Sequence, residues 1–477
     1  MYSRKQMQSG KNRQMNRASG SFRDPSGYVY IGDGEIVRTI HSEYQAHWPA
    51  VEPFLNKLSE KWLLVPFKET DPLEGSYKTL AVQKLPFISY PYEWSFSQLK
   101  AAALLTLQLQ RLALADGLIL KDASAFNIQY IGCKPVLIDH LSFEVLEPGR
   151  PWDAYRQFCS HFLAPLALAS MTDLECGALS RLWIDGIPLP IAAKMLPFKA
   201  VCRFGLFLHL FLHARSQNKY ADTGRYAKKA KQIRISRTSL DNIAASLERT
   251  VSSLQSPGGK TEWSDYYENT NYSAEAAGNK AALVEKFAQY GPKRDLALDL
   301  GANTGKYSEL LARHYALALS VDMDPLAVER NFIALQKRNS PANNILPLVI
   351  NLANPSPSLG FNCAERQSFS ARIKADCVTG LALIHHLTIT SGIPLSVQAE
   401  FFSDLLMDEG TLILEFIPKN DSQVQRLLAF RKDIFPDYTL EDCLKSFNRF
   451  ECVKIEPIAG SERTLLLFKK TSESSPG

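Results

Sequence analysis

The sequence predicts an α/β fold for the C-terminal half of the chain and an α+β domain in front of it. Two observations support this prediction. Short apolar runs alternate with helical patterns throughout the second half, as they do when strands and helices form one layered sheet. The chain also has 477 residues, 45% of them hydrophobic and 22% charged, and this length exceeds one usual domain. We therefore expect two domains, each with its own core.

The first β-α-β unit of the C-terminal half begins at the apolar run 296–300. Gly301 and Gly305 follow directly, in the sequence GANTG, and let the turn approach a ligand before a helical pattern starts. A second apolar run, 316–321, ends in Asp322, which lies 17 residues after Gly305. In dinucleotide-binding folds, an acidic residue at a spacing of about 20 binds a ribose hydroxyl. The unit therefore predicts a nucleoside-containing cofactor.

Five more runs complete the predicted sheet. Residues 345–350, 376–379 and 411–416 are expected to be its third, fourth and fifth strands, with helical patterns between them. Two β-like runs, 451–455 and 463–469, follow near the C-terminus and are joined by a short connection containing Pro, Gly and Ser. A closing antiparallel pair of this kind is absent from ordinary dinucleotide-binding domains.

Together these features resemble class I S-adenosylmethionine (SAM) methyltransferases, which have a seven-stranded Rossmann-like sheet. The resemblance implies SAM as cofactor, with Asp322 accepting hydrogen bonds from its ribose and Asp299 helping to shape the turn under its methionine part. Asn351 stands where this family usually has an aspartate that contacts the adenine amino group, and Asn303 departs from the commoner G-x-G-x-G turn. The expected cofactor-binding residues are Asp299, Gly301, Asn303, Gly305, Asp322 and Asn351.

Two histidines follow the fourth strand, at the expected mouth of the site. His385 and His386 lie in the sequence GLALIHHL, where an acceptor would meet the methyl group. Either imidazole is a candidate general base for a hydroxyl or amine, because imidazole titrates near neutral pH. The alternative is a pair of hydrogen-bonded wall residues. Glu415, at the end of the fifth strand, is a further candidate contact to the acceptor.

The N-terminal half carries a different signature between residues 120 and 144. Asp122 is followed five residues later by Asn127 and, after a hairpin pattern, by Asp139. This order resembles the catalytic and metal-binding segment of kinase-like folds. The resemblance implies that Asp122 positions an acceptor hydroxyl and that Asn127 and Asp139 bind the Mg²⁺ of Mg-ATP. However, no kinase-type glycine-rich loop is visible, and Arg38 stands where the phosphate-binding lysine is expected, so the favoured alternative is a domain that presents the substrate.

The domain boundaries are expected from composition. Residues 1–24 are predicted to be a flexible basic tail, 25–250 the kinase-like or substrate-presenting domain, 251–262 a linker and 263–477 the methyltransferase domain. We expect the part after the linker to fold alone and bind SAM. Four aromatic residues that follow the linker would either form a lid over the cofactor or pack as an ordinary cluster: Trp263, Tyr266, Tyr267 and Tyr272.

The remaining composition limits the compartment and the partners. The eight cysteines form no C-x-x-C pair, so reduced thiols in a cytoplasmic protein are expected. No apolar core follows the first basic residues, and the most apolar segment, 195–214, contains Lys199 and Arg203, so neither a signal peptide nor a membrane span is expected. Residues 213–240 hold eight Lys/Arg against one acid, which suits RNA, but few aromatics are interleaved and a solvated face is favoured.

From about residue 120 to 436 the chain is similar to a group of bacterial SAM-dependent methyltransferases, some of them labelled nodulation-protein-like. The similarity is carried by phrases such as LKDASAFNIQYIGCKPVLIDHLSFE, WDAYRQFCSHFLAPLAL and EFIPKNDSQVQRLL. It implies methyl transfer to an O or N acceptor, with a small molecule, glycan or protein favoured over RNA. The alternatives are a phosphotransferase with a SAM-binding module and a non-catalytic two-domain binding protein.

Overall fold

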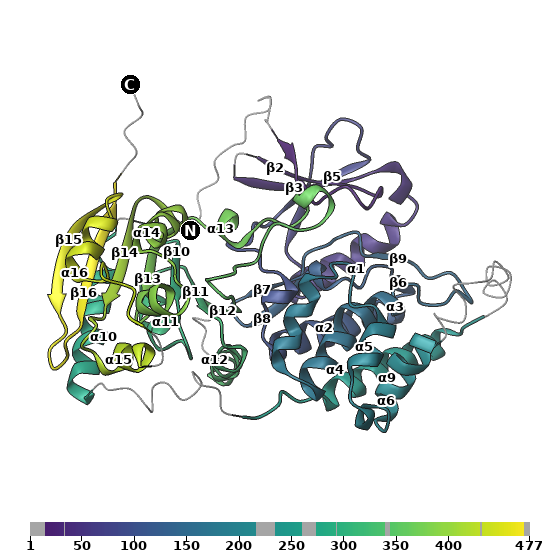
Figure 1. Ribbon diagram of the computed structural model, residues 1–477. Coiled ribbons are helices and arrows are strands. Elements are labelled where there is room, and N and C mark those ends of the chain that lie inside the picture. Colours follow the sequence, from purple (N-terminus) through teal and green to yellow (C-terminus); the bar gives the residue numbers. More distant parts are fainter. Residues whose placement is uncertain are drawn as a thin grey trace.

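The computed structural model describes residues 15–32, 34–215, 234–259, 273–291, 293–338, 344–429 and 432–471. Figure 1 shows two halves that lie side by side, a C-terminal half built on one sheet and an N-terminal half in which a strand-rich part lies above a helical part. The four aromatic residues expected as a lid, and residues 216–233 of the basic stretch, lie outside the described residues.

The C-terminal half contains a seven-stranded sheet with the order β12-β11-β10-β13-β14-β16-β15. The strands from β12 to β14 pair in parallel, whereas β16 is antiparallel to both β14 and β15. This sheet confirms the predicted fold class, including the closing antiparallel pair. The strands are β10 (Leu296–Leu300), β11 (Leu317–Asp322), β12 (Ile345–Val349), β13 (Ala375–Gly380), β14 (Leu406–Phe416), β15 (Phe450–Pro457) and β16 (Thr464–Lys470).

Helices connect these strands, as the alternating pattern predicted. The start of α12 illustrates the local chemistry: the Asp324 side chain accepts the backbone N–H of Leu326, and Pro325 occupies the first helical position. The helices of this half are α10 (Ala274–Ala288), α11 (Lys306–Leu311), α12 (Pro325–Lys337), η8 (Phe361–Cys363), α13 (Phe369–Arg372), η9 (His386–Thr390), α14 (Leu395–Leu405), α15 (Ser422–Leu428) and α16 (Leu440–Ser446).

The N-terminal half begins with a five-stranded antiparallel sheet of order β1-β2-β3-β5-β4. Two smaller antiparallel pairs follow, β6 with β9 and β7 with β8, and the second pair is the predicted hairpin. The strands are β1 (Asn16–Arg17), β2 (Val29–Gly32), β3 (Glu35–Ile40), β4 (Phe67–Thr70), β5 (Lys78–Val82), β6 (Leu118–Leu120), β7 (Ile128–Ile131), β8 (Lys134–Leu137) and β9 (Phe143–Val145).

The helical part of this half packs around the long helix α2, whose N-terminus is capped by the Ser95 side chain. The α-helices are α1 (Trp48–Glu60), α2 (Phe96–Ala115), α3 (Tyr155–Phe158), α4 (Ala164–Met171), α5 (Leu189–Met195), α6 (Phe204–Leu206) and α9 (Arg237–Ser253). The 3-10 and π turns are η1 (Ser42–Tyr44), η2 (Pro91–Glu93), η3 (Ala125–Asn127), η4 (Cys159–Leu163), η5 (Leu174–Arg181), η6 (Phe198–Ala200) and η7 (Phe207–Leu212). None of the helices in the described parts of the chain has the length and apolar character needed to span a bilayer.

The start of the chain departs from the expected flexible tail. Asn16 and Arg17 form β1 and pair with Ile31 and Tyr30 of β2. The Arg23 side chain binds the Glu365 carboxylate of the C-terminal half through Nε and Nη2, at 2.9 and 2.8 Å. Backbone pairing and this ion pair hold the segment in place, so the tail prediction fails for residues 16–23. Residues 1–14 lie outside the described residues.

The two halves share a buried interface. The segment of residues 350–374, which joins β12 to β13 and is called here the crossover segment, runs over to the N-terminal strands as a green trace in Figure 1. Its Arg372 donates from Nη1 to Glu93 Oε2 at 3.1 Å and to the Ile88 carbonyl at 2.6 Å. Nearby, Ser97 donates from its backbone N and from Oγ to the Glu329 carboxylate of α12, at 2.9 and 2.5 Å. One apolar core cluster contains residues of both halves.

Replacing Arg372 with Met should destabilise the whole chain. The side chains of Arg372 and Glu93 are 4% and 0% exposed, so the change leaves a buried carboxylate without its cation. Such a loss costs about 3 to 5 kcal/mol in unfolding free energy, measured by urea denaturation. The matched change Arg313→Met breaks a surface pair with Glu285 and should cost about 1 kcal/mol or less. Equal losses in the two variants would contradict the assignment.

Candidate functional site

The turn after β10 is held in left-handed backbone conformations that glycine adopts easily. Gly301 and Gly305 have φ angles of 74° and 82°, and Asn303 has 51°. A Cβ atom on Gly305 would lie 2.5 Å from Asn331 Nδ2 of α12. The sequence suggested that Gly305 leaves room for a ligand. In the structure, the side chain that demands a glycine there is Asn331, so Gly305 fixes the packing of the turn against α12.

Asp299, in the strand before this turn, connects it to α11 and β13 through hydrogen bonds. Its Oδ2 accepts a hydrogen bond from Ser308 Oγ of α11, and its Oδ1 accepts one from Thr379 Oγ1 of β13, both at 2.6 Å. Burial raises the pKa of Asp299, and these two hydrogen bonds oppose that rise. The residue therefore sets the shape of the turn through the protein's own hydroxyls.

Asp322, the acidic residue at the end of β11, also supports the turn. Its Oδ2 accepts the backbone N–H of Asn303 at 2.7 Å, and its Oδ1 accepts that of Asp324 at 2.9 Å. Burial raises the pKa of Asp322 to about 6. Each carboxylate oxygen has a second lone pair, so a ribose hydroxyl can still donate to this group.

A cavity of about 180 Å³ lies between the two halves and is called here the interface pocket. Met323 and Asn351 line it from the carboxyl ends of β11 and β12, where open α/β sheets bind ligands. The Asn351 side-chain oxygen accepts the N–H of Ala353 at 2.9 Å, so this amide is partly engaged.

The opposite wall of the interface pocket comes from the N-terminal half. It includes Tyr92, Glu175, Ala178 and Arg181. The Tyr92 hydroxyl is buried and has no hydrogen-bond partner among the described residues. Sequence reasoning missed these residues because they lie more than 140 positions before Asp322, and nothing in their local pattern points to the C-terminal half.

His385 and His386 follow β13 and lie against each other, with ring centroids 4.0 Å apart. His385 is 1% exposed, and its Nδ1 has no hydrogen-bond partner among the described residues. Burial lowers the pKa of His386 to about 4 and also lowers the pKa of His385 well below its usual value. Both rings are therefore neutral at pH 7. This environment therefore does not favour the titration of either imidazole near neutral pH that the sequence predicted.

Glu415 is enclosed by cations and cannot face an acceptor. Its Oε2 binds Lys280 Nζ at 2.7 Å and accepts the N–H of Ala382 at the same distance. Arg463 Nη1 lies 3.6 Å from the other oxygen, and the Glu415 side chain is fully buried. The prediction of an acceptor contact fails here. The residue instead anchors α10 and the loop after β13 to the sheet.

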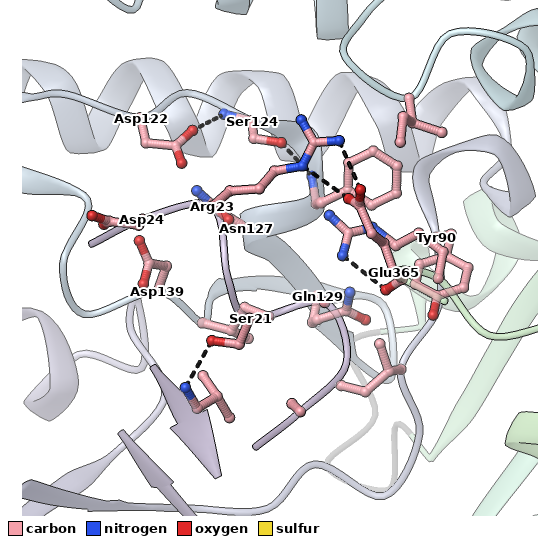
Figure 2. Close-up of a pocket in the computed structure, with 18 of the residues that line it drawn as sticks. Ser21, Arg23, Asp24, Tyr90, Asp122, Ser124, Asn127, Gln129, Asp139 and Glu365 are labelled. Atoms are coloured by element: carbon pink, nitrogen blue, oxygen red, sulfur yellow. Dashed lines mark hydrogen bonds and ion pairs between the residues drawn. The ribbon is translucent and has the colours of Figure 1, made fainter. Parts of the chain in front are cut away.

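A much larger cavity, of about 1750 Å³ and called here the cleft, is lined mostly by the N-terminal half and partly by the crossover segment, including Arg366. The structure brings Asp122, Asn127 and Asp139 together on its wall, and Figure 2 shows them on the side opposite Tyr90 and Glu365. Asp139 Oδ1 binds Arg38 Nη2 of β3 at 2.8 Å, and Oδ2 accepts from Ser142 Oγ at 2.6 Å. The arginine noted in place of the expected lysine is therefore the partner of the second aspartate.

Asp122 accepts hydrogen bonds from several neighbouring residues, including Asn127. Its Oδ1 accepts the Ser124 N–H at 2.9 Å and the Gln157 Nε2 at 2.7 Å. Burial, followed by the nearby charge of Asp139, raises its pKa. Among the described residues no group of three or more His, Cys, Asp and Glu side chains could hold a metal. Mg²⁺ commonly uses one or two carboxylates together with phosphate oxygens, and Asn127 and Asp139 suit that mode.

Acidification should destabilise the chain partly through His386. Its folded-state pKa of about 4 lies below the ordinary 6.5, so the unfolded state binds more protons between these values. Its contribution is present above pH 6.5 and is lost as the pH falls towards 4, by up to about 3 kcal/mol. His386→Gln should show a shallower loss of unfolding free energy over this window in urea titrations. An unchanged slope would mean that the ring is solvated.

No family model matches the chain. Solved structures similar to its C-terminal part include SAM-dependent methyltransferases. The N-methyltransferase NodS of Bradyrhizobium japonicum WM9 is 14% identical, covers 42% of this chain and 99% of its own, and gives a TM-score of 0.32. The magnesium protoporphyrin IX methyltransferase ChlM of Synechocystis PCC 6803, with bound S-adenosylhomocysteine, is 16% identical over 43% of this chain and 90% of its own, with a TM-score of 0.31. These likenesses transfer no residue role.

A whole-length relative exists among curated proteins. Nodulation protein NoeA of Rhizobium meliloti (strain 1021) is 36% identical over 466 residues, which cover 95% of this chain and 96% of the relative. The match therefore includes the cleft, the interface and the seven-stranded sheet. Identity at this level over both halves shows that the chain belongs to the NoeA family of nodulation proteins.

Proposed function

We propose that this protein is a SAM-dependent methyltransferase that transfers a methyl group to an O or N atom of its acceptor. The observation that carries the proposal is the position of the interface pocket. It lies at the carboxyl ends of β11 and β12, where its lining includes Asn351 and Met323, the residue that directly follows Asp322. A nucleoside bound there would lie next to an acidic hydrogen-bond acceptor and against the apolar side chain of Met323.

The residues fit this cofactor. Asp322 would accept from the ribose, Asn351 would face the adenine through its amide, and the 301–305 turn would lie under the methionine part. SAM, when bound, supplies a methyl group on a sulfonium that is already activated. The protein's main task is then to position the acceptor in line with that methyl group, and positioning alone contributes several kcal/mol to such reactions.

The low pKa of His386 argues for this positioning role. A general base works best when its pKa lies near the operating pH, and a pKa of about 4 makes a weak base at pH 7. We therefore propose that His385 and His386 form the wall against which the acceptor packs.

The family relationship suggests that the methylation belongs to nodulation. A small molecule, a glycan or a protein fits this role better than RNA, because few aromatic residues are interleaved with the basic residues of the sequence 213–240. The eight cysteines are all free thiols, which agrees with a reducing, cytoplasmic location.

Methyl-labelled SAM tests the reaction directly. Incubated with fractionated bacterial extract, the full chain should label one fraction. Asp322→Ala should abolish labelling and weaken SAM binding in calorimetry by about 1 to 3 kcal/mol, because it removes a charge-assisted hydrogen bond. His386→Gln should keep both SAM affinity and at least about a tenth of the rate, since no proton transfer is lost. SAM binding without labelling of any fraction would favour the non-catalytic alternative.

The N-terminal wall of the interface pocket gives a second test. Ala178 is exposed at the pocket, so Ala178→Trp should fold normally and fill the space. We expect SAM affinity to fall at least about tenfold, or about 1.4 kcal/mol. Thr172→Trp, an exposed change outside the pocket, is the control and should bind SAM like the wild type. Equal SAM affinity of all three proteins would mean that the C-terminal half alone forms the SAM site, as the sequence suggested.

A further inference from the structure

The most apolar segment of the chain, residues 195–214, is only partly covered by the rest of the protein. Together with the helix before it, this segment forms α5, η6, α6 and η7 of the N-terminal half. In Figure 1, α6 lies at the lower edge of that half, at the end opposite the five-stranded sheet. No residue from 191 to 214 lines the cleft or the interface pocket. Neither cavity therefore accounts for the side chains that this segment exposes.

Large apolar side chains are concentrated on the exposed side of these helices. Phe198 is 84% exposed and Phe204 is 74% exposed. From Phe204 onward, α6 and η7 form one continuous helix, along which exposed apolar residues recur every four positions, and α5 packs against η7. The six exposed residues, called here the apolar face, are Ile191, Met195, Phe198, Phe204, Leu208 and Leu212. A cluster of this kind on a protein surface marks an interaction site.

The charges around the apolar face are positive. The sequence from 186 to 215 has no Asp or Glu, and it contains four exposed basic residues, Lys194, Lys199, Arg203 and Arg215. Helix α9 contacts α6, but its two acids, Asp241 and Glu248, already pair with Arg111, each at 2.9 Å. The partner of this face therefore has to accept both apolar side chains and cations.

These two requirements separate the classes of partner. In a two-fold dimer, a second copy of the chain would bring the same cations against each other. Single-stranded RNA binds through stacking on aromatic rings, and four of the six exposed side chains have no ring. An anionic lipid bilayer meets both requirements, because its acyl chains take up apolar side chains and its phosphate groups attract Lys and Arg.

We propose that the apolar face docks on the surface of an anionic lipid bilayer. Phe198 and Phe204 enter the boundary between headgroups and acyl chains, and Lys194, Lys199 and Arg203 lie at the level of the phosphate groups. The protein then rests on the membrane without crossing it. Because the apolar face lies apart from the interface pocket, this proposal is independent of the proposed methyl transfer.

Co-sedimentation of the full chain with lipid vesicles tests the proposal. Vesicles of phosphatidylcholine and phosphatidylglycerol in equal amounts should bind the chain. Vesicles of phosphatidylcholine alone should bind it at least about tenfold more weakly, because each basic residue near an anionic surface contributes about fivefold to the affinity. Added NaCl should release the chain from the mixed vesicles, since salt screens this attraction. Equal binding to both vesicles, or binding to neither, would overturn the proposal.

Serine variants then assign the binding to the apolar face. Phe198→Ser and Phe204→Ser should each weaken binding to the mixed vesicles by about tenfold, because each removes an aromatic side chain that the bilayer buries. Phe361→Ser, at a phenylalanine of the C-terminal half that is 75% exposed, is the matched control and should bind like the wild type. Urea denaturation should give the same midpoint for the wild type and the two variants of the apolar face, since neither side chain is buried in the fold.

The same variants separate lipid from the other partners. Unchanged vesicle affinity in both Phe198→Ser and Phe204→Ser would refute the assignment to this face. Sedimentation equilibrium without lipid shows whether the chain forms a dimer, and an RNA oligonucleotide serves as a second probe. Dimer formation or RNA binding that these variants abolish, without vesicle binding by the wild type, would replace lipid as the partner.

Discussion

The pairing of Glu93 with Arg372 is the contact on which the arrangement of the two halves depends. Both side chains are almost wholly buried, and Glu93 also accepts the Tyr90 backbone N–H at 2.9 Å. Burying a carboxylate and a guanidinium is costly, so this pair stabilises the fold only while the geometry stays correct. The pair therefore fixes the position of the crossover segment relative to the N-terminal half. The crossover segment lies where the pair holds it, and the residues around it line the cleft.

The same interface determines the surroundings of the proposed cofactor site. The Ser97 and Glu329 hydrogen bonds hold the start of α2 against α12, the helix that follows Asp322 and Met323. Gln98 adds a hydrogen bond from Nε2 to the Pro347 carbonyl of β12 at 3.0 Å. As a result, the wall formed by η2 and η5 stands opposite the carboxyl ends of β11 and β12. The N-terminal half thus completes a pocket that would otherwise be open to solvent.

The sequence predicted what depends on local periodicity and spacing. The apolar run before Gly301, the acidic end of β11 and the closing antiparallel strands all lie where their patterns indicated. Asp122, Asn127 and Asp139 line one cavity, as their spacing predicted, because the antiparallel β7–β8 hairpin brings the residue after β8 back near the residue before β7. Glu415 and Arg366 could not be interpreted in this way. Their contacts involve partners 135 and 240 positions away in the chain, Lys280 and Phe126, which only the folded structure brings near.

The crossover segment limits how such a protein can evolve by domain exchange. Two-domain enzymes commonly diversify by exchange of one domain for another, because few contacts cross the boundary. Here a single excursion of the chain from the C-terminal sheet supplies part of the wall of the N-terminal cavity. A recombined chain would lose the partners of Arg23, Tyr90 and Phe126 together. We therefore expect that exchanging either half alone would disrupt the wall of the cleft.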